Sequence, residues 1–140
     1  MTQQTAPCAV TERVIGIIAE VLDIPPHTIT PETRILRDLE TESIDLLEFG
    51  VGLNAAFGIP VADDTVFLTS LRVHLEEARH ADADPYKMMA GRYPHLSCDR
   101  VACILRTLDD GPVLSVQDIA DYVLHALRAG QHEKAPSHAG

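Results

Sequence analysis

The chain has 140 residues, and its 21 Asp and Glu against 11 Lys and Arg give a formal net charge of −10 at neutral pH. This acidic surplus disfavours binding to nucleic acids or anionic membranes and favours basic protein partners. No apolar run approaches membrane-spanning length, and residues 1–4 lack the charged and apolar regions of a secretory signal. We therefore expect a cytoplasmic protein with one compact domain.

Apolar residues at helical spacing predict a first helix that is capped by Thr11 and stopped by Pro25-Pro26. The segment 27–39 is predicted to be a loop with at most a short turn, in which Thr30 caps Pro31. A second helix begins near Ser43 and has two apolar faces. The face expected to join the core holds Leu46, Phe49, Gly50, Leu53 and Phe57, and the face expected to stay partly exposed holds Ile44, Leu47 and Val51.

Gly50 and Gly52 are unusual inside this helix, because each costs about 1 kcal/mol relative to Ala. Two hypotheses are open for Gly50: it leaves room for a bound acyl chain, or it lets another helix approach closely. Simple tolerance of the glycine is the alternative to both.

The segment 65–112 has its own helical pattern. One helix is predicted from Phe67 to Ala78, and a second follows Ser97 as its cap, with a loop or short helix over 86–94. Ser115 and Asp118 predict a capping box for a last helix that ends at Gly130, and residues 131–140 are predicted to be a disordered tail. The prediction is an all-α bundle in a single domain, 1–130, with an additional helical hairpin inserted at about 65–112.

Acidic residues are concentrated around one serine. Between Asp38 and Asp64 the chain has seven Asp or Glu and no Lys or Arg. Because no histidine or lysine lies close in sequence to activate Ser43, a Ser-His-Asp nucleophile is poorly supported. A helix start has unpaired backbone N–H groups and the positive end of the helix dipole, which suit a phosphodiester anion carried on the side chain. The sequence therefore predicts an attachment point at Ser43.

The motifs Asp38-Leu39, Glu42-Ser43-Ile44-Asp45 and Phe57-Gly58-Ile59-Pro60 resemble those of an acyl carrier protein. The family usually has Asp-Ser-Leu at 42–44 and Gly at the position of Glu40. The resemblance implies an acyl-carrier-like bundle with 4'-phosphopantetheine on Ser43, transferred from coenzyme A by a phosphopantetheinyl transferase. The thiol of this arm would hold acyl or polyketide intermediates as thioesters. The resemblance thus implies a carrier, not an enzyme, with no catalytic residues of its own.

The resemblance also implies that partner enzymes recognise the helix after Ser43. We predict that Glu42, Asp45 and Glu48 steer acyl-loading, condensing or acyl-transfer enzymes with basic docking surfaces, more weakly at high salt. Ile44, Leu47 and Val51 would supply apolar contact, and Asp38 would add to this surface from the preceding loop.

Three other functions are open. An aminoacyl or peptidyl carrier of a non-ribosomal assembly line shares the arm and the bundle, although the acidity around Ser43 favours fatty-acid or polyketide partners. The replaced neighbours, Glu42 and Ile44, make an unmodified carrier-like interaction module conceivable. A hydrolase that uses Ser43 is the third.

Metal and disulfide chemistry are not predicted. Cys8, Cys98 and Cys103 are an odd set without CxxC spacing, so we expect reduced thiols. The spacing of these cysteines and the neighbouring histidines matches no standard arrangement of zinc ligands.

Overall fold

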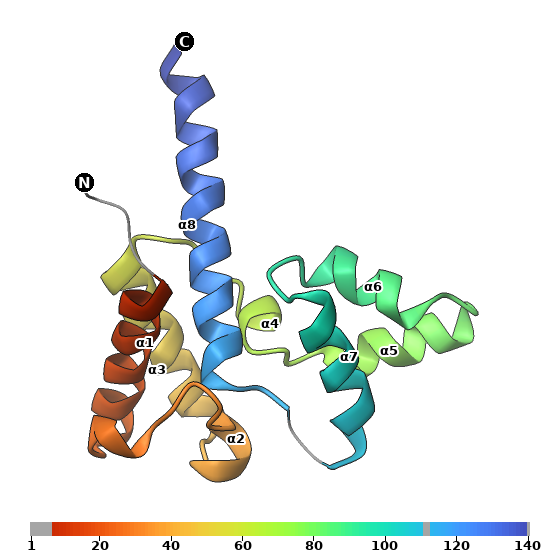
Figure 1. Cartoon of the computed structure of the whole chain (residues 1–140), viewed down its shortest axis with the longest axis horizontal. Helices are drawn as coiled ribbons and strands as arrows, with labels where there is room; N and C mark the ends of the chain where they lie inside the picture. The colour runs from red at the N-terminus through yellow and green to blue at the C-terminus, as the bar shows by residue number, and fades with distance from the viewer. Residues whose placement is uncertain (1–6, 111–112, 140) are drawn as a thin grey trace.

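The computed structural model describes residues 7–110 and 113–139, and it confirms the all-α prediction. Within these residues the extended pairing consists of a single bridge between Arg34 and Ser115. Figure 1 shows two groups of helices, joined by α4 and by the segment that leads into α8. The first group contains α1 (Pro7–Leu22), α2 (Ile35–Asp38), α3 (Ser43–Phe57) and α8 (Val116–Ala139). The rest are α4 (Asp63–Val66), α5 (Leu71–His80), α6 (Pro85–Arg92) and α7 (Cys98–Thr107), with short 3₁₀ turns η1 (Pro26–Thr28) and η2 (Leu108–Asp110).

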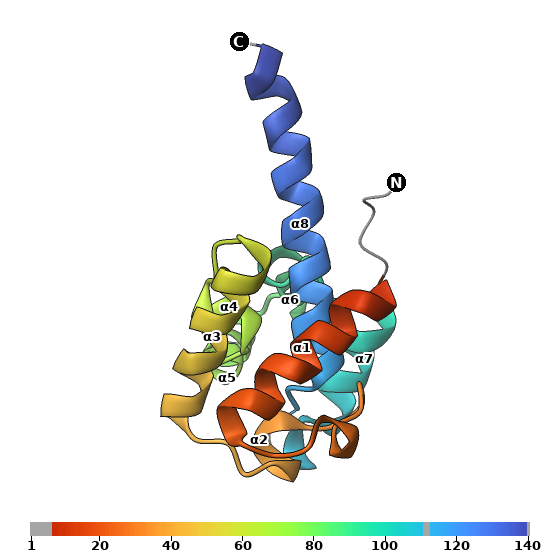
Figure 2. The ribbon, with the colours of Figure 1, turned by 90° about the vertical axis from the view of Figure 1, so that its left-hand side faces the viewer.

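Helix α1 packs against both α3 and α8, and these three helices enclose the main core (Figure 2). Core side chains with almost no exposed surface include Val14 and Ile18 of α1, Phe49 and Leu53 of α3, and Val123 of α8. The predicted start of α1 was wrong: the helix begins at Pro7, and Thr11 lies inside it. Proline suits a first helical position because the N–H it lacks has no intrahelical partner there.

A close approach of α1 and α3 explains Gly52. A Cβ atom built on this glycine would lie 2.8 Å from Cγ2 of Ile17, which is shorter than van der Waals contact. Close helix approach, one of the two hypotheses for Gly50, therefore applies to Gly52. Gly50 is buried, and its role stays a prediction.

The segment before α3 is mostly loop, as predicted, and it is tied to the start of α8. The Ile35 N–H donates to the Leu114 carbonyl at 2.9 Å, and the Thr41 hydroxyl donates to the Ile35 carbonyl at 2.8 Å. Thr30 does not cap a helix, because its N–H donates to the Thr33 hydroxyl at 2.9 Å in a turn. These bonds hold the approach to Ser43 against the bundle.

The segment 65–112 has more helices than the predicted hairpin. The helix predicted over 67–78 starts later than predicted, because residues 67–70 form turns before α5, and Leu68 there has a left-handed backbone (φ 55°) that an α-helix does not contain. Helix α6 occupies the region predicted as loop or short helix, and the Asp84 carboxylate caps it by accepting from the Tyr86 N–H at 2.9 Å. The cap predicted for α7 is confirmed, since the Ser97 hydroxyl accepts from the Arg100 N–H at 3.1 Å.

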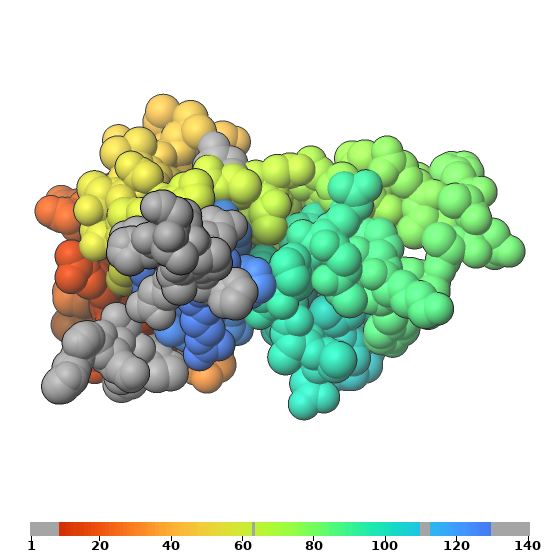
Figure 3. Space-filling model, turned by 90° about the horizontal axis from the view of Figure 1, so that it is seen from above, coloured from red at the N-terminus to blue at the C-terminus, as the bar shows by residue number. Residues whose placement is uncertain are grey.

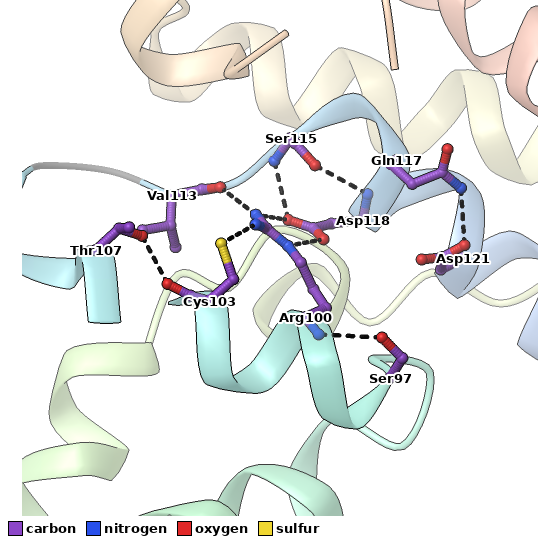
Figure 4. A network of polar contacts seen from close by, with 9 residues as sticks. All are labelled: Ser97, Arg100, Cys103, Thr107, Val113, Ser115, Gln117, Asp118 and Asp121. Atoms are coloured by element: carbon purple, nitrogen blue, oxygen red, sulfur yellow. Dashed lines mark hydrogen bonds and ion pairs between the residues drawn. The ribbon is translucent and has the colours of Figure 1, made fainter. Parts of the chain in front are cut away.

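A partly buried ion pair joins α7 to α8 (Figure 4). Arg100 of α7 binds Asp118 of α8 through two bonds, Nε to Oδ1 at 2.7 Å and Nη2 to Oδ2 at 2.8 Å. Asp118 is 0% exposed and also accepts from the Ser115 N–H at 3.0 Å, which confirms the predicted capping box. Hydrogen bonding to Asp118 raises the pKa of Arg100. Figure 3 shows the two groups as adjoining lobes.

The last helix is longer than predicted. Helix α8 does not end at Gly130, because the helical backbone continues to Ala139 (Figure 1). A single glycine costs only about 1 kcal/mol in a helix, and its neighbours Ala129 and Gln131 are good helix formers. The division into a domain over 1–130 and a tail stays a prediction, and residues 1–4 lie outside the described part.

Candidate functional site

Ser43 is the first residue of α3, and it is exposed. The preceding residue, Glu42, has an extended backbone, and its N–H donates to the Asp45 carboxylate at 3.0 Å. This capping interaction fixes where the helix starts. The hydroxyl therefore lies at the positive end of a helix of 15 residues and is accessible to solvent.

The turn before Ser43 requires an unusual backbone at Glu40. Its φ is 52°, in the left-handed region that glycine adopts without steric cost. This geometry gives a physical reason for the glycine that the acyl carrier pattern usually has there. Nearby, Asp38 is exposed, and its carboxylate accepts from the Arg34 N–H at 2.9 Å, so this predicted partner residue also stabilises its own turn.

Helix α3 presents an apolar strip, defined as Ile44, Leu47 and Val51, which are 58%, 55% and 71% exposed. This confirms the predicted exposed face, and the buried Phe49 and Leu53 confirm the core face. Among the predicted partner-binding acids, Glu42 and Glu48 are exposed, whereas Asp45 is partly buried and engaged in the helix cap. Binding of partners by these residues stays a prediction.

A pocket of about 370 Å³ lies beside Ser43, which is one of its lining residues. The walls come from α2, α3, the turn after α4, α5, η2 and the segment before α8. Nine of the twelve described residues that line it are apolar, including Leu46, Phe67, Leu71 and Leu108. No local sequence pattern predicts this pocket, because its residues are spread from 36 to 114.

Among the described residues that line the pocket, none is able to activate Ser43 as a nucleophile. Beside the apolar residues these are Ser43, Thr69 and Arg72, without a histidine or a carboxylate. Elsewhere in the described ranges, no three or more His, Cys, Asp or Glu residues gather in a group that could hold a metal ion. Over the same ranges no helix is both long and apolar enough to cross a membrane.

A family model described as "Phosphopantetheine attachment site" matches residues 12–84. The chain is 32% identical over 56 residues to the acyl carrier protein of Helicobacter pylori (strain G27), an alignment that covers 40% of this chain and 72% of that protein. The chain belongs to the acyl carrier protein family. It is also 40% identical over 50 residues to the acyl carrier protein AcpXL of Brucella melitensis biotype 1, which covers 36% of this chain and 54% of AcpXL.

Membership in the acyl carrier protein family confirms two predictions that the resemblance carried. The cofactor is covalently attached 4'-phosphopantetheine, and the protein is a non-catalytic carrier. The matched residues contain Ser43 and the whole of α3, whereas α6, α7 and α8 lie beyond them.

Proposed function

We propose that this chain is a discrete acyl carrier protein whose 4'-phosphopantetheine arm is attached to Ser43. The arm carries acyl or polyketide intermediates as thioesters to separate enzymes. The observation that carries this proposal is the exposed Ser43 at the first position of α3, within the matched family segment. An exposed hydroxyl at a helix start fits the group, because the unpaired N–H groups and helix dipole favour the phosphodiester charge.

The proposed partners are a phosphopantetheinyl transferase and acyl-handling enzymes with basic entrances. Support comes from the surface next to Ser43, where the exposed acids Glu42 and Glu48 flank the apolar strip. Charge of one sign around an apolar contact increases the rate of encounter with an oppositely charged surface. The same acidity favours acyl or polyketide intermediates over aminoacyl or peptidyl ones.

The test is modification of the purified protein by coenzyme A and a broad-specificity phosphopantetheinyl transferase. Intact-mass spectrometry should show the addition of one phosphopantetheine, and Ser43→Ala should abolish it. Ser97→Ala is the matched control, because Ser97 is also an exposed serine at a helix start but is the cap of another helix, α7. It should be modified like the native chain.

An unmodified native chain, in a reaction where another carrier protein is fully modified, would instead support the carrier-like interaction module. Modification that survives in Ser43→Ala would place the arm elsewhere. Labelling of Ser43 by a serine-reactive phosphonate without coenzyme A would favour the hydrolase.

A further inference from the structure

Arg72 brings a positive charge to the pocket beside Ser43. It is the second residue of α5, and it is exposed. Ser43 and Arg72 both line this pocket of about 370 Å³, and Arg72 is the one charged residue among the described residues of the lining. Helix packing therefore places a cation at the same pocket as the serine to which we assign the arm.

The guanidinium of Arg72 is held in place without losing its charge. Its Nη2 donates to the carbonyl oxygen of Leu108 in η2 at 2.7 Å, and Leu108 also lines the pocket. A carbonyl is a neutral acceptor and a guanidinium has five N–H donors, so this bond leaves donors and the full charge for an anion. Arg79 and Arg100 each form an ion pair with a carboxylate, whereas Arg72 forms none within the part of the chain that the structure describes.

The acidic surroundings of Ser43 give this cation a role toward the arm. The phosphodiester that joins the arm to a serine has a negative charge, and the exposed Glu42 directly precedes Ser43. From Asp38 to Asp64 the chain has seven Asp or Glu and no Lys or Arg, so a cation that offsets the repulsion has to come from another part of the fold. A guanidinium suits this task, because its N–H groups can bind two phosphate oxygens at once.

We propose that Arg72 binds the phosphodiester of the 4'-phosphopantetheine arm on Ser43 and so holds the beginning of the arm against α5. The inference rests on the proposed function, since it requires the arm at Ser43. It gives the arm a contact with a helix other than the one that carries it, and the bond to Leu108 orients the guanidinium for that contact.

Phosphorus NMR of the full chain with its arm tests this contact. Coenzyme A and the transferase would install the unacylated arm on the native chain and on each variant, verified by intact mass. Arg72→Gln should move the phosphodiester resonance, because the charge beside the phosphate is removed. Arg106→Gln is the matched control, since Arg106 is an exposed arginine of α7 that is not among the described residues of the pocket lining. It should leave the resonance in place.

A second measurement compares the unfolding temperature with and without the arm at low salt. Within one protein this difference cancels the loss of the Leu108 bond, which affects both forms. The arm should be less favourable in Arg72→Gln than in the native chain by about 2 °C, a small difference because the ion pair is exposed. High salt should reduce this difference, and Arg72→Lys, which keeps the charge, should restore part of the native value.

Three outcomes would overturn the proposal while the verified arm still supports the carrier function. The first is a phosphodiester resonance at the same position in the native chain and in Arg72→Gln. The second is an equal displacement of the resonance in Arg106→Gln, which would show a general effect of charge. The third is an effect of the arm on the unfolding temperature that Arg72→Gln leaves unchanged. Absence of the arm from the native chain in the mass spectrum would instead contradict the proposed function.

Discussion

Glu40 occupies a backbone conformation that most side chains avoid. Its φ of 52° places it in the left-handed region, two residues before the cap of α3. A residue with a Cβ atom pays about 1–2 kcal/mol there, and glycine does not. The turn is nevertheless held, because Thr41 and Asp38 on either side of it both hydrogen-bond to the backbone. Backbone strain at Glu40 is thus tolerated close to Ser43, where we propose that the arm is attached.

Glu40→Gly should stabilise the protein by about 1 kcal/mol, because it removes this strain. Urea denaturation of both proteins measures the difference. Glu20→Gly is the control: Glu20 is an exposed glutamate inside α1, where glycine should cost about 1 kcal/mol. Equal destabilisation by the two substitutions would show that Glu40 is not strained in solution.

The packing of α1 on α3 depends on the missing side chain at Gly52. The neighbouring atom, Cγ2 of Ile17, is attached directly to a β-branched carbon and has little freedom to move aside. Gly16 of α1 is the opposite case, with nothing within 4 Å of an added Cβ atom. The two helices therefore contain one glycine that the contact requires and one that it does not.

Gly52→Ala should destabilise by about 1 kcal/mol, since the overpacking cost exceeds the gain in helix propensity. Gly16→Ala should stabilise by a similar amount, because only the propensity gain applies. Chemical denaturation of both variants is the measurement. In an Ile17→Ala background the cost of Gly52→Ala should vanish, and a cost that persists there would mean that Ile17 is not its source.

A partly buried histidine lies where the segment between α6 and α7 meets α8. The ring of this residue, His95, packs edge-on against Tyr122 of α8 and against Tyr93, with ring centroids 5.3 Å and 6.4 Å apart. Neither of its ring nitrogens has a hydrogen-bond partner among the residues that the structure describes. Burial lowers the pKa of His95 to about 4; nearby His125 also lowers it, and Asp118 opposes the shift.

Protonation of His95 should make the protein less stable in acid. An unfolded histidine binds a proton below about pH 6.5, whereas the folded one resists it down to about pH 4, so stability falls as the pH drops between these values. His95→Phe keeps the ring contacts and removes the titration. Its stability relative to the native chain should rise from pH 7 to pH 5.

Urea denaturation at these two pH values measures this change, and His27→Phe, at an exposed position of η1, is the control. The same relative stability of His95→Phe at both pH values would contradict the assignment.

Local signals predicted several parts of this protein. The Ser115–Asp118 and Ser97 caps, the two faces of α3 and the serine at its start depend on residues within a few positions of one another, and each is found in the structure. The predicted start of α1 and the predicted end of α8 were wrong, because helix propensity continues past a possible capping residue or a lone glycine. The later start of α5, at Leu71, was missed because a leucine such as Leu68 has no preference for the left-handed backbone that it adopts.

The amino-acid sequence alone determined the helical class, the candidate attachment residue and the acidic, partly apolar surface of α3, since helical periodicity and charge are written in neighbouring residues. Tertiary structure decided how the segment 65–112 packs on the bundle. The pocket beside Ser43 and the Arg100–Asp118 pair bring together residues far apart in the chain, and their positions follow from how helices pack, which no short stretch of sequence encodes.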